Sequence, residues 1–313
     1  MVHIHHILCP VDFSDFSRHA FDCAVGVARN YGADVTVLHV LPVPSLVPAV
    51  PYGPEGPGPF GFGTVDREGA LSELKRFLPI ESAGVPVQFH VVESGSVHGE
   101  IQVQTSKLRT DLVVMGTHGR SGFDRLVLGS AAEKTLRTSR VPVLIVPPRV
   151  PETPAFSRNP FGHVLCAVDF SQDSARALGY AVSLARRAGG RLTLVHVVEP
   201  MPLGYDPMVG VTFDIVAYEE AVAESARRQL RQFVPEDLAQ TSSVDTVVIQ
   251  GKAYREILRL AAERDVDLIV LGSYGGRSES MEKIFFGATA EKVIRTAGCA
   301  VLTVPLPAKK IVT

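Results

Sequence analysis

Cysteine is scarce in this sequence, with four residues in 313, and no two of them form a Cys-x-x-Cys pair. Cys9 and Cys166 lie within apolar, strand-like runs, where a thiol behaves as a small hydrophobic side chain. A disulfide framework is therefore not expected. This use of cysteine is typical of a protein in a reducing compartment.

Long apolar runs are missing as well. No stretch approaches the roughly 18 apolar residues of a membrane-spanning helix, so no membrane partner is expected. The chain from Met1 has no long apolar core before Asp12, which argues against a signal peptide. These absences predict a cytoplasmic protein.

The sequence has no excess of charge of either sign. Its 31 Lys and Arg residues nearly balance 33 Asp and Glu residues, and no run is rich in Lys or Arg. A nucleic-acid partner is therefore not expected. Hydrophobic residues make up 46% of the chain, which is enough for two cores. Because a domain usually has roughly 100–200 residues, the length of the chain predicts two domains.

Motifs of a dedicated catalyst are absent too. The sequence has no Gly-x-Ser-x-Gly turn, no His-Glu-x-x-His pair and no Gly-x4-Gly-Lys-Ser/Thr phosphate loop. His3 and His5 would share a strand face and could hold a metal, but a frayed polar terminus is the favoured interpretation. We assign no catalytic residue and no metal ligand.

What the sequence does contain is an internal repeat. Four segments recur in the same order at an offset of 156 to 158 residues, which indicates a gene duplication. The matched pairs are 7–14 with 164–171, 37–40 with 194–197, 111–116 with 267–272, and 141–146 with 299–304. The repeat predicts domains at 1–147 and 162–307. Residues 147–160 hold five prolines, so 148–161 is predicted to be an extended linker.

Each copy alternates short apolar runs with helical patterns, and this rhythm predicts an α/β fold of two open doubly wound domains. The strand runs are apolar on both faces, as in a parallel sheet covered by helices on both sides. In the first copy we expect strands at 4–11, 34–41, 86–92, 111–116 and 141–147, with helices at 15–31, 66–83, 97–109 and 129–139. A long helix is expected near 213–234 in the second copy.

One segment breaks this rhythm. Residues 42–63 hold seven prolines and five glycines, which excludes a helix or a central strand. The segment leaves the carboxyl end of the second strand, the edge at which such sheets bind ligands. A surface loop without order and a lid or partner-binding loop both remain open.

The residues that point to chemistry form the pattern G-x2-G-x9-G-S. Gly116 and Gly119 follow a strand and permit a tight turn with close backbone approach. Gly129 and Ser130 open a helix, whose unpaired amides and positive dipole end favour an anion. His118, Arg120 and Arg125 lie in the intervening loop and could reach phosphate oxygens. Two purely structural turns are the alternative.

Asp12 closes the first predicted strand. Strands one and four should flank the crevice where strand order reverses, so Asp12 is expected near the glycine loop. Its carboxylate could accept hydrogen bonds from a ribose or a base. The alternative role is a helix N-cap, for which Ser14 competes.

Four features together resemble the universal stress protein family: the Val11-Asp12-Phe13-Ser14 start, the Leu38-His39-Val40 strand, the glycine loop and the Val141–Val146 ending. The match spans both copies, as in a tandem member. The resemblance implies a five-stranded parallel sheet in each copy and, in nucleotide-binding members, ATP in the crevice. The implied contacts are Pro10, Val11, Asp12 and Val40 for adenine and ribose, Met115, Gly116, Gly119 and Arg120 for the phosphate loop, and Gly129, Ser130 and Ala131 for the phosphates. Ala132 departs from the family pattern, which often has a hydroxyl there.

The second copy departs further. It keeps Asp169 and Val197, but its loop runs from Gly272 and Gly275 through eleven residues to Gly287. Ala288 replaces the serine, and Thr289 is the residue that could compensate. Whether this copy binds nucleotide stays open; if it binds, we expect another affinity or another ligand.

The resemblance also implies that the domains pair through their last strands, here Val141–Val146 and Ala300–Val304. Such pairing would cover edge strands that are otherwise exposed, and a homodimer of the whole chain is a further expectation. The leading hypothesis is an ATP-binding regulatory protein of a bacterial or archaeal stress response, with Mg²⁺ as an optional companion of ATP. A slow ATPase or nucleotidyl transferase and a nucleotide-free scaffold are the rivals.

Overall fold

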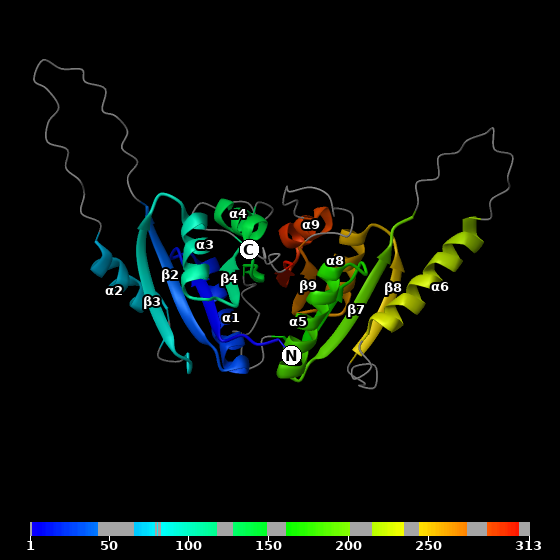
Figure 1. Cartoon of the computed structure of the whole chain (residues 1–313), viewed down its shortest axis with the longest axis horizontal. Helices are drawn as coiled ribbons and strands as arrows, with labels where there is room; N and C mark the ends of the chain where they lie inside the picture. The colour runs from blue at the N-terminus through cyan, green and yellow to red at the C-terminus, as the bar shows by residue number, and fades with distance from the viewer. Residues whose placement is uncertain are drawn as a thin grey trace, which may run out of the picture.

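The computed structural model describes residues 2–42, 66–78, 80, 83–117, 128–148, 161–200, 215–234, 244–273 and 287–306, and both halves of the chain repeat one order of elements (Figure 1). The first half contains β1 (His6–Pro10), α1 (Asp15–Tyr31), β2 (Asp34–Pro42), α2 (Arg67–Phe77), β3 (Val87–Ser94), α3 (Val97–Lys107), β4 (Leu112–Gly116), α4 (Ser130–Thr138) and β5 (Val143–Val146). The second half contains β6 (His163–Ala167), α5 (Gln172–Ala188), β7 (Arg191–Val198), α6 (Ile215–Phe233), β8 (Val244–Gln250), α8 (Ala253–Glu263), β9 (Leu268–Gly272), α9 (Ala288–Thr296) and β10 (Ala300–Val304).

The described strands form one sheet of ten, in the order β3-β2-β1-β4-β5-β10-β9-β6-β7-β8. Neighbours within each half are parallel, which confirms the predicted doubly wound α/β class. At the centre β5 and β10 pair antiparallel, with Leu144 opposite Leu302. These two strands cover each other's edges, so a homodimer of the whole chain would have to use another surface, such as the outer strands β3 and β8.

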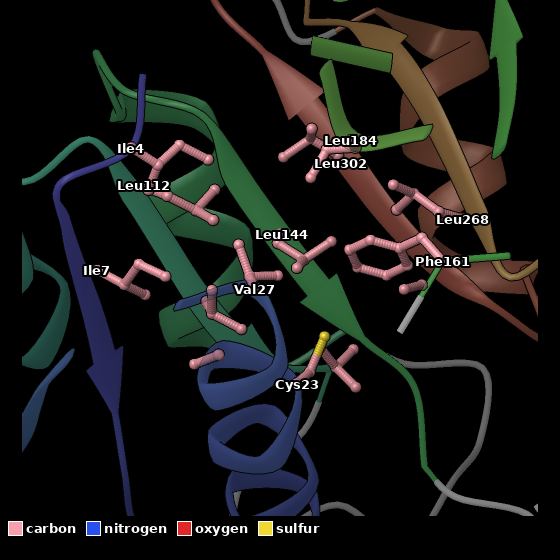
Figure 2. Close-up of a cluster of buried hydrophobic side chains, with 14 of the residues drawn as sticks. Ile4, Ile7, Cys23, Val27, Leu112, Leu144, Phe161, Leu184, Leu268 and Leu302 are labelled. Carbon is pink, nitrogen blue, oxygen red and sulfur yellow. The ribbon is translucent and has the colours of Figure 1, made fainter. Parts of the chain in front are cut away.

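Two hydrophobic clusters run the length of the sheet, one on each face. The first packs α1, α2, α5 and α6 against the strands, and the second packs α3, α4, α8 and α9. Figure 2 shows the first cluster gathering side chains of both halves, with Ile7 and Leu112 from one and Leu268 and Leu302 from the other. Because both clusters continue across the centre, the halves share their cores.

Polar contacts add to this shared boundary. The Tyr31 hydroxyl donates to Ser183 at 2.8 Å, and the Arg187 guanidinium lies 4.4 Å from the Tyr31 ring centre. On the other face α4 and α9 meet near the middle of the molecule (Figure 1). There Arg137 pairs with Glu291 at 3.4 Å, and the related Arg295 pairs with Glu133 at 3.3 Å.

Helix and strand ends depart from the predicted ones in a few places. The first helix, 15–31, was predicted with its correct bounds. The predicted helix 66–83 ends at Phe77, because Leu78 is extended (φ −102°, ψ 135°) and the next residue in the sequence is Pro79. β3 runs two residues beyond its predicted end, to Ser94.

The favoured interpretation of the N-terminus as a frayed end was wrong. Ile4 is buried, and the Asp111 carboxylate accepts hydrogen bonds from the backbone amides of His5 and His6. The His6 ring contacts the hydroxyls of Thr110 and Thr36 at 3.1 and 2.8 Å. This segment is therefore an ordered part of the first core.

Two predicted segments lie largely outside the described residues. They are the proline- and glycine-rich stretch at 42–63, of which only Pro42 is described as the end of β2, and the linker at 148–161, of which 149–160 are not described. Across the described ranges, no helix combines the length and the apolar character that a membrane span requires.

All four cysteines are free, and we expect them to be unreactive in the folded protein. Burial raises the pKa of Cys9, Cys23 and Cys166 far above its usual range, and it raises the pKa of Cys299 to about 12. Thiols so protonated are poor nucleophiles. Titration with a disulfide reagent at pH 8 should modify none of them promptly, whereas the chain in guanidinium should release four equivalents. Prompt modification of Cys9 in the folded chain would contradict its placement in the core.

Candidate functional site

A cavity of about 250 Å³ opens where β1 and β4 end and α3 and α4 begin. This is the point at which strand order reverses, the usual ligand site of an open α/β sheet. Of the residues predicted for the first copy, the cavity lining includes Pro10, Val11, Asp12, Val40, Met115, Gly116, Gly129, Ser130 and Ala131. The predicted His118, Gly119 and Arg120, and with them Arg125, lie outside the described residues.

Several lining residues were not singled out from the sequence. Val97 and Ile101 stand one helical turn apart on α3 and form an apolar wall, and their spacing of four was the available signal. His39, noted in the sequence only as part of the Leu38-His39-Val40 strand, also lines the cavity. Ser17 and Thr117 complete the polar part of the lining, and nothing local in the sequence marked them.

Asp12 is held beside the cavity by the start of α1. Its carboxylate oxygen Oδ1 accepts hydrogen bonds from the backbone amide of Ser14 at 3.2 Å and from its hydroxyl at 2.6 Å. Ser14, not Asp12, is the N-cap of α1, since its side chain accepts from the Ser17 amide. The start of α1 therefore orients Asp12 toward the edge of the crevice, and Asp12 is not needed as the N-cap of the helix.

The backbone next to Asp12 is strained in a defined way. Phe13 has φ +64°, a left-handed conformation that a bulky residue rarely adopts. The imidazole of His39 donates from Nδ1 to the Val11 carbonyl at 2.7 Å, and the Phe13 ring packs edge-on against it at 4.7 Å. These contacts fix the turn, so His39 supports the shape of the cavity as well as lining it.

The same arrangement recurs in the second half. Phe170 has φ +63°, and His196 Nδ1 donates to the Val168 carbonyl at 2.8 Å. The Phe170 ring lies 4.4 Å from His196, and Oδ1 of Asp169 accepts from Ser171 as Asp12 does from Ser14. Two halves that have diverged elsewhere both keep this strained turn, which points to a role in ligand binding.

Gly116 is needed for packing and not only for a turn. It lies at the end of β4, where an added Cβ would come within 2.9–3.0 Å of Phe16, including its backbone carbonyl. Gly272 stands in the same relation to Asp173 in the second half. The backbone that comes close to Gly116 is the first turn of α1, and Gly116 also lines the cavity.

The amino end of α4 carries no side-chain cap. Its N-cap residue is Gly129, whose lack of a side chain leaves the first amides without the hydroxyl or carboxylate that Ser14, Asp66 and Ser96 supply to α1, α2 and α3. The Gly129 amide itself bonds to the Thr117 carbonyl at 2.8 Å and closes the base of the loop. An uncapped helix start that opens on a cavity favours an anion.

The second half holds a matching cavity of about 210 Å³. Its lining includes the predicted Asp169, Val197, Gly272, Gly287, Ala288 and Thr289, whereas Gly275 lies outside the described residues. The loop base is closed as in the first half, by a bond from the Gly287 amide to the Ser273 carbonyl at 3.0 Å. Two extra loop residues therefore leave the start of α9 in place, and Thr289 brings a hydroxyl to the cavity one position after Ala288.

Metal ligands are sparse around these cavities. Over the ranges that the structure describes, there is no group of three or more His, Cys, Asp or Glu side chains able to hold a metal ion.

Comparison with known proteins agrees with the repeat. A model of the universal stress protein family matches residues 3–147 and again residues 160–305. The chain belongs to the universal stress protein family. The resemblance read from the sequence motifs is thereby confirmed, including its tandem form.

Individual universal stress proteins align with one repeat or with both. Universal stress protein MJ0531 of Methanocaldococcus jannaschii is 34% identical over 142 residues, which cover 45% of this chain and 80% of that protein. Universal stress protein Rv2319c of Mycobacterium tuberculosis is 25% identical over 303 residues, which cover 91% of this chain and 94% of that protein.

A solved structure agrees in fold. The crystal structure of a universal stress protein from Archaeoglobus fulgidus superposes with a TM-score of 0.63 at 23% identity, covering 96% of this chain and 98% of that one. The fold of this universal stress protein is therefore shared over both halves.

Proposed function

We propose that this tandem universal stress protein binds ATP in the cavity of its first half and acts as a nucleotide-dependent regulator in a bacterial or archaeal stress response. The observation that carries the proposal is the uncapped start of α4, which faces a cavity whose opposite edge holds the oriented carboxylate of Asp12. One end of this cavity suits phosphate and the other suits a ribose or a base. The free thiols, three of them buried, support a cytoplasmic site of action.

The lining supplies a contact for each part of the nucleotide. Pro10, Val11 and Val40 form the apolar edge for adenine, and Asp12 accepts hydrogen bonds from the ribose hydroxyls. Phosphate oxygens accept hydrogen bonds from the backbone amides at the start of α4 and from the Ser130 hydroxyl. Ala132 is buried at the same helix start and has no hydroxyl to offer, so we expect one phosphate contact fewer than in relatives with a hydroxyl there.

A Mg²⁺ ion would come to this site with the phosphates. Most of its coordination would then be phosphate and water oxygens, as is common for this ion. Asp12 is the lining carboxylate of the first cavity that could join its coordination. Nucleotide binding is therefore expected to persist, with lower affinity, when the ion is removed by chelation.

Equilibrium dialysis of the purified chain against labelled ATP tests the proposal. We expect saturable binding, weakened about tenfold to a hundredfold by Asp12→Ala because charge-assisted hydrogen bonds to the ligand contribute about 1.5–3 kcal/mol. The matched control is Asp15→Ala. Asp15 is an acidic residue in the first turn of α1 that does not line the cavity, so this variant should bind like the parent chain. Absence of binding to the parent chain at millimolar ATP would overturn the proposal.

A further inference from the structure

The mouth of the second cavity carries a cluster of positive side chains around one tyrosine. Lys292 on α9 places its Nζ 4.6 Å from the ring centre of Tyr254 on α8, and Arg255 donates from Nε to the Tyr254 hydroxyl at 3.0 Å. Lys252 immediately precedes α8. We call Lys252, Arg255 and Lys292, together with Tyr254, the mouth cluster. It borders the cavity, because the lining includes Ala253, between Lys252 and Tyr254, and Ala290, two residues before Lys292.

The charges of the mouth cluster are poorly balanced. Other cations on the same helices are paired: Arg259 with Glu256 and Glu263, and Arg295 with Glu291 and Glu133. Within the described part of the chain, no ion pair joins Lys252, Arg255 or Lys292 to an acidic side chain. Glu199 is the nearby carboxylate, and it accepts from the Ala253 amide at 3.0 Å. The three cations of the mouth cluster therefore lack the carboxylate partners that Arg259 and Arg295 have.

The tyrosine registers this positive field. The hydrogen bond from Arg255 and the charges of Arg255, Lys292 and Lys252 lower the pKa of Tyr254 below its usual value. A field that favours a phenolate also favours the oxygens of any other anion placed there.

The first half has no counterpart to the mouth cluster. By the repeat, Ser96, His98 and Gly99 stand where the second half has Lys252, Tyr254 and Arg255, and Lys134 alone corresponds to a cation, Lys292. Ser96 caps α3, whereas Lys252 makes no side-chain cap for α8. The second half therefore has more positive charge at the mouth of its cavity than the first half has. Its Ala288 lacks the hydroxyl that Ser130 has at the matching position of the first half.

We propose that the mouth cluster is a phosphate subsite of the second cavity, which takes an adenosine ligand whose phosphoryl group lies between α8 and α9. This inference rests on the proposed nucleotide binding by the two cavities. The chain segment between Gly272 and Gly287 contains Arg277 and Lys283 but also Glu279 and Glu282, so that loop adds no net charge. Among the residues of this half that the structure describes, the mouth cluster brings together cations without an ion-pair partner, and Arg255 offers several N–H donors.

The test uses the full chain with the first site blocked by Ser130→Asp. Calorimetric titration compares ATP, adenosine 3′,5′-bisphosphate and adenosine on this chain, with and without Lys252→Gln, Arg255→Gln and Lys292→Gln together. We expect the triple change to weaken binding of the preferred phosphorylated ligand about tenfold or more, with adenosine affinity unchanged. Preference for ATP assigns a 5′-phosphate to the cluster, and preference for the bisphosphate assigns a 3′-phosphate. Arg259→Gln, which removes a paired cation of α8, is the control and should change neither affinity.

The outcomes separate the two proposals. The phosphate subsite would be overturned if the triple change weakened adenosine binding as much as binding of the phosphorylated ligand, or if it weakened neither. It would also be overturned if the ligand released by the triple change were an acidic peptide. The phosphate subsite is also overturned if the parent chain binds one equivalent of ATP and the Ser130→Asp chain binds none. That outcome would still support ATP binding by the first cavity. If the parent chain binds no nucleotide at all, both proposals fail. The circular dichroism of the variants should match the parent, since all three side chains are exposed.

Discussion

Ser130→Asp is expected to lower the affinity of the first cavity for ATP by about a hundredfold or more, without loss of stability. An aspartate at the first residue of α4 places a negative charge where the phosphates would bind, and two like charges 4 Å apart repel by about 4 kcal/mol near a protein surface. The same charge interacts favourably with the positive end of the helix, by about 0.3–1 kcal/mol. Calorimetric titration and a thermal melt on the same sample measure both effects.

Ser130→Ala and Ala288→Asp are the matched controls for this change. Ser130→Ala removes one hydroxyl donor and should reduce affinity less than Ser130→Asp does, because a hydrogen bond to a charged group contributes about 1.5–3 kcal/mol and no repulsive charge is added. Ala288→Asp puts the same charge at the start of α9 and should leave the first cavity unaffected. ATP affinity of Ser130→Asp equal to that of the parent would show that the ligand does not use the start of α4.

Much of the fold could be read from the sequence because its signals are local and occur twice. The apolar runs that became β1, β4, β6 and β9 are buried on both faces, and hydrophobic runs of that kind predict parallel strands. Gly129 and Ser130 were placed correctly at a helix start from their order alone. The crevice followed from the fold class, since an open α/β sheet binds ligands where strand order reverses, and β1 and β4 do pair there.

The remainder depends on contacts between residues distant in the chain. Nothing near Gly116 in the sequence shows that Phe16, a hundred residues earlier, fills the space beside it. Lys292 meets Tyr254 only because α8 and α9 pack side by side. The order of the His5 and His6 backbone likewise comes from the distant carboxylate of Asp111. Local patterns identify elements, whereas such contacts require the register of the whole sheet.

Gly116→Val is expected to destabilise the chain by about 1–3 kcal/mol or more. A valine suits a strand better than glycine does, so intrinsic propensity alone predicts a gain in the free energy of unfolding. Against this, the new Cβ would lie 2.9–3.0 Å from Cβ and backbone atoms of Phe16, and the backbone of α1 cannot yield as a flexible side chain can. Urea unfolding followed by circular dichroism gives the sign of the change in the free energy of unfolding. That sign decides between strand propensity and the clash with Phe16.

Gly179→Ala supplies the contrast. Gly179 lies within α5, where an added Cβ meets no atom within 4 Å beyond its own helix, so this change should stabilise by about 0.5–1 kcal/mol. If Gly116→Val were neutral or stabilising, the end of β4 would have room for a side chain, and the first turn of α1 would not be fixed there. Because that turn also holds Asp12 through Ser14, we expect a destabilising Gly116→Val to weaken ATP binding more than Ser130→Ala does.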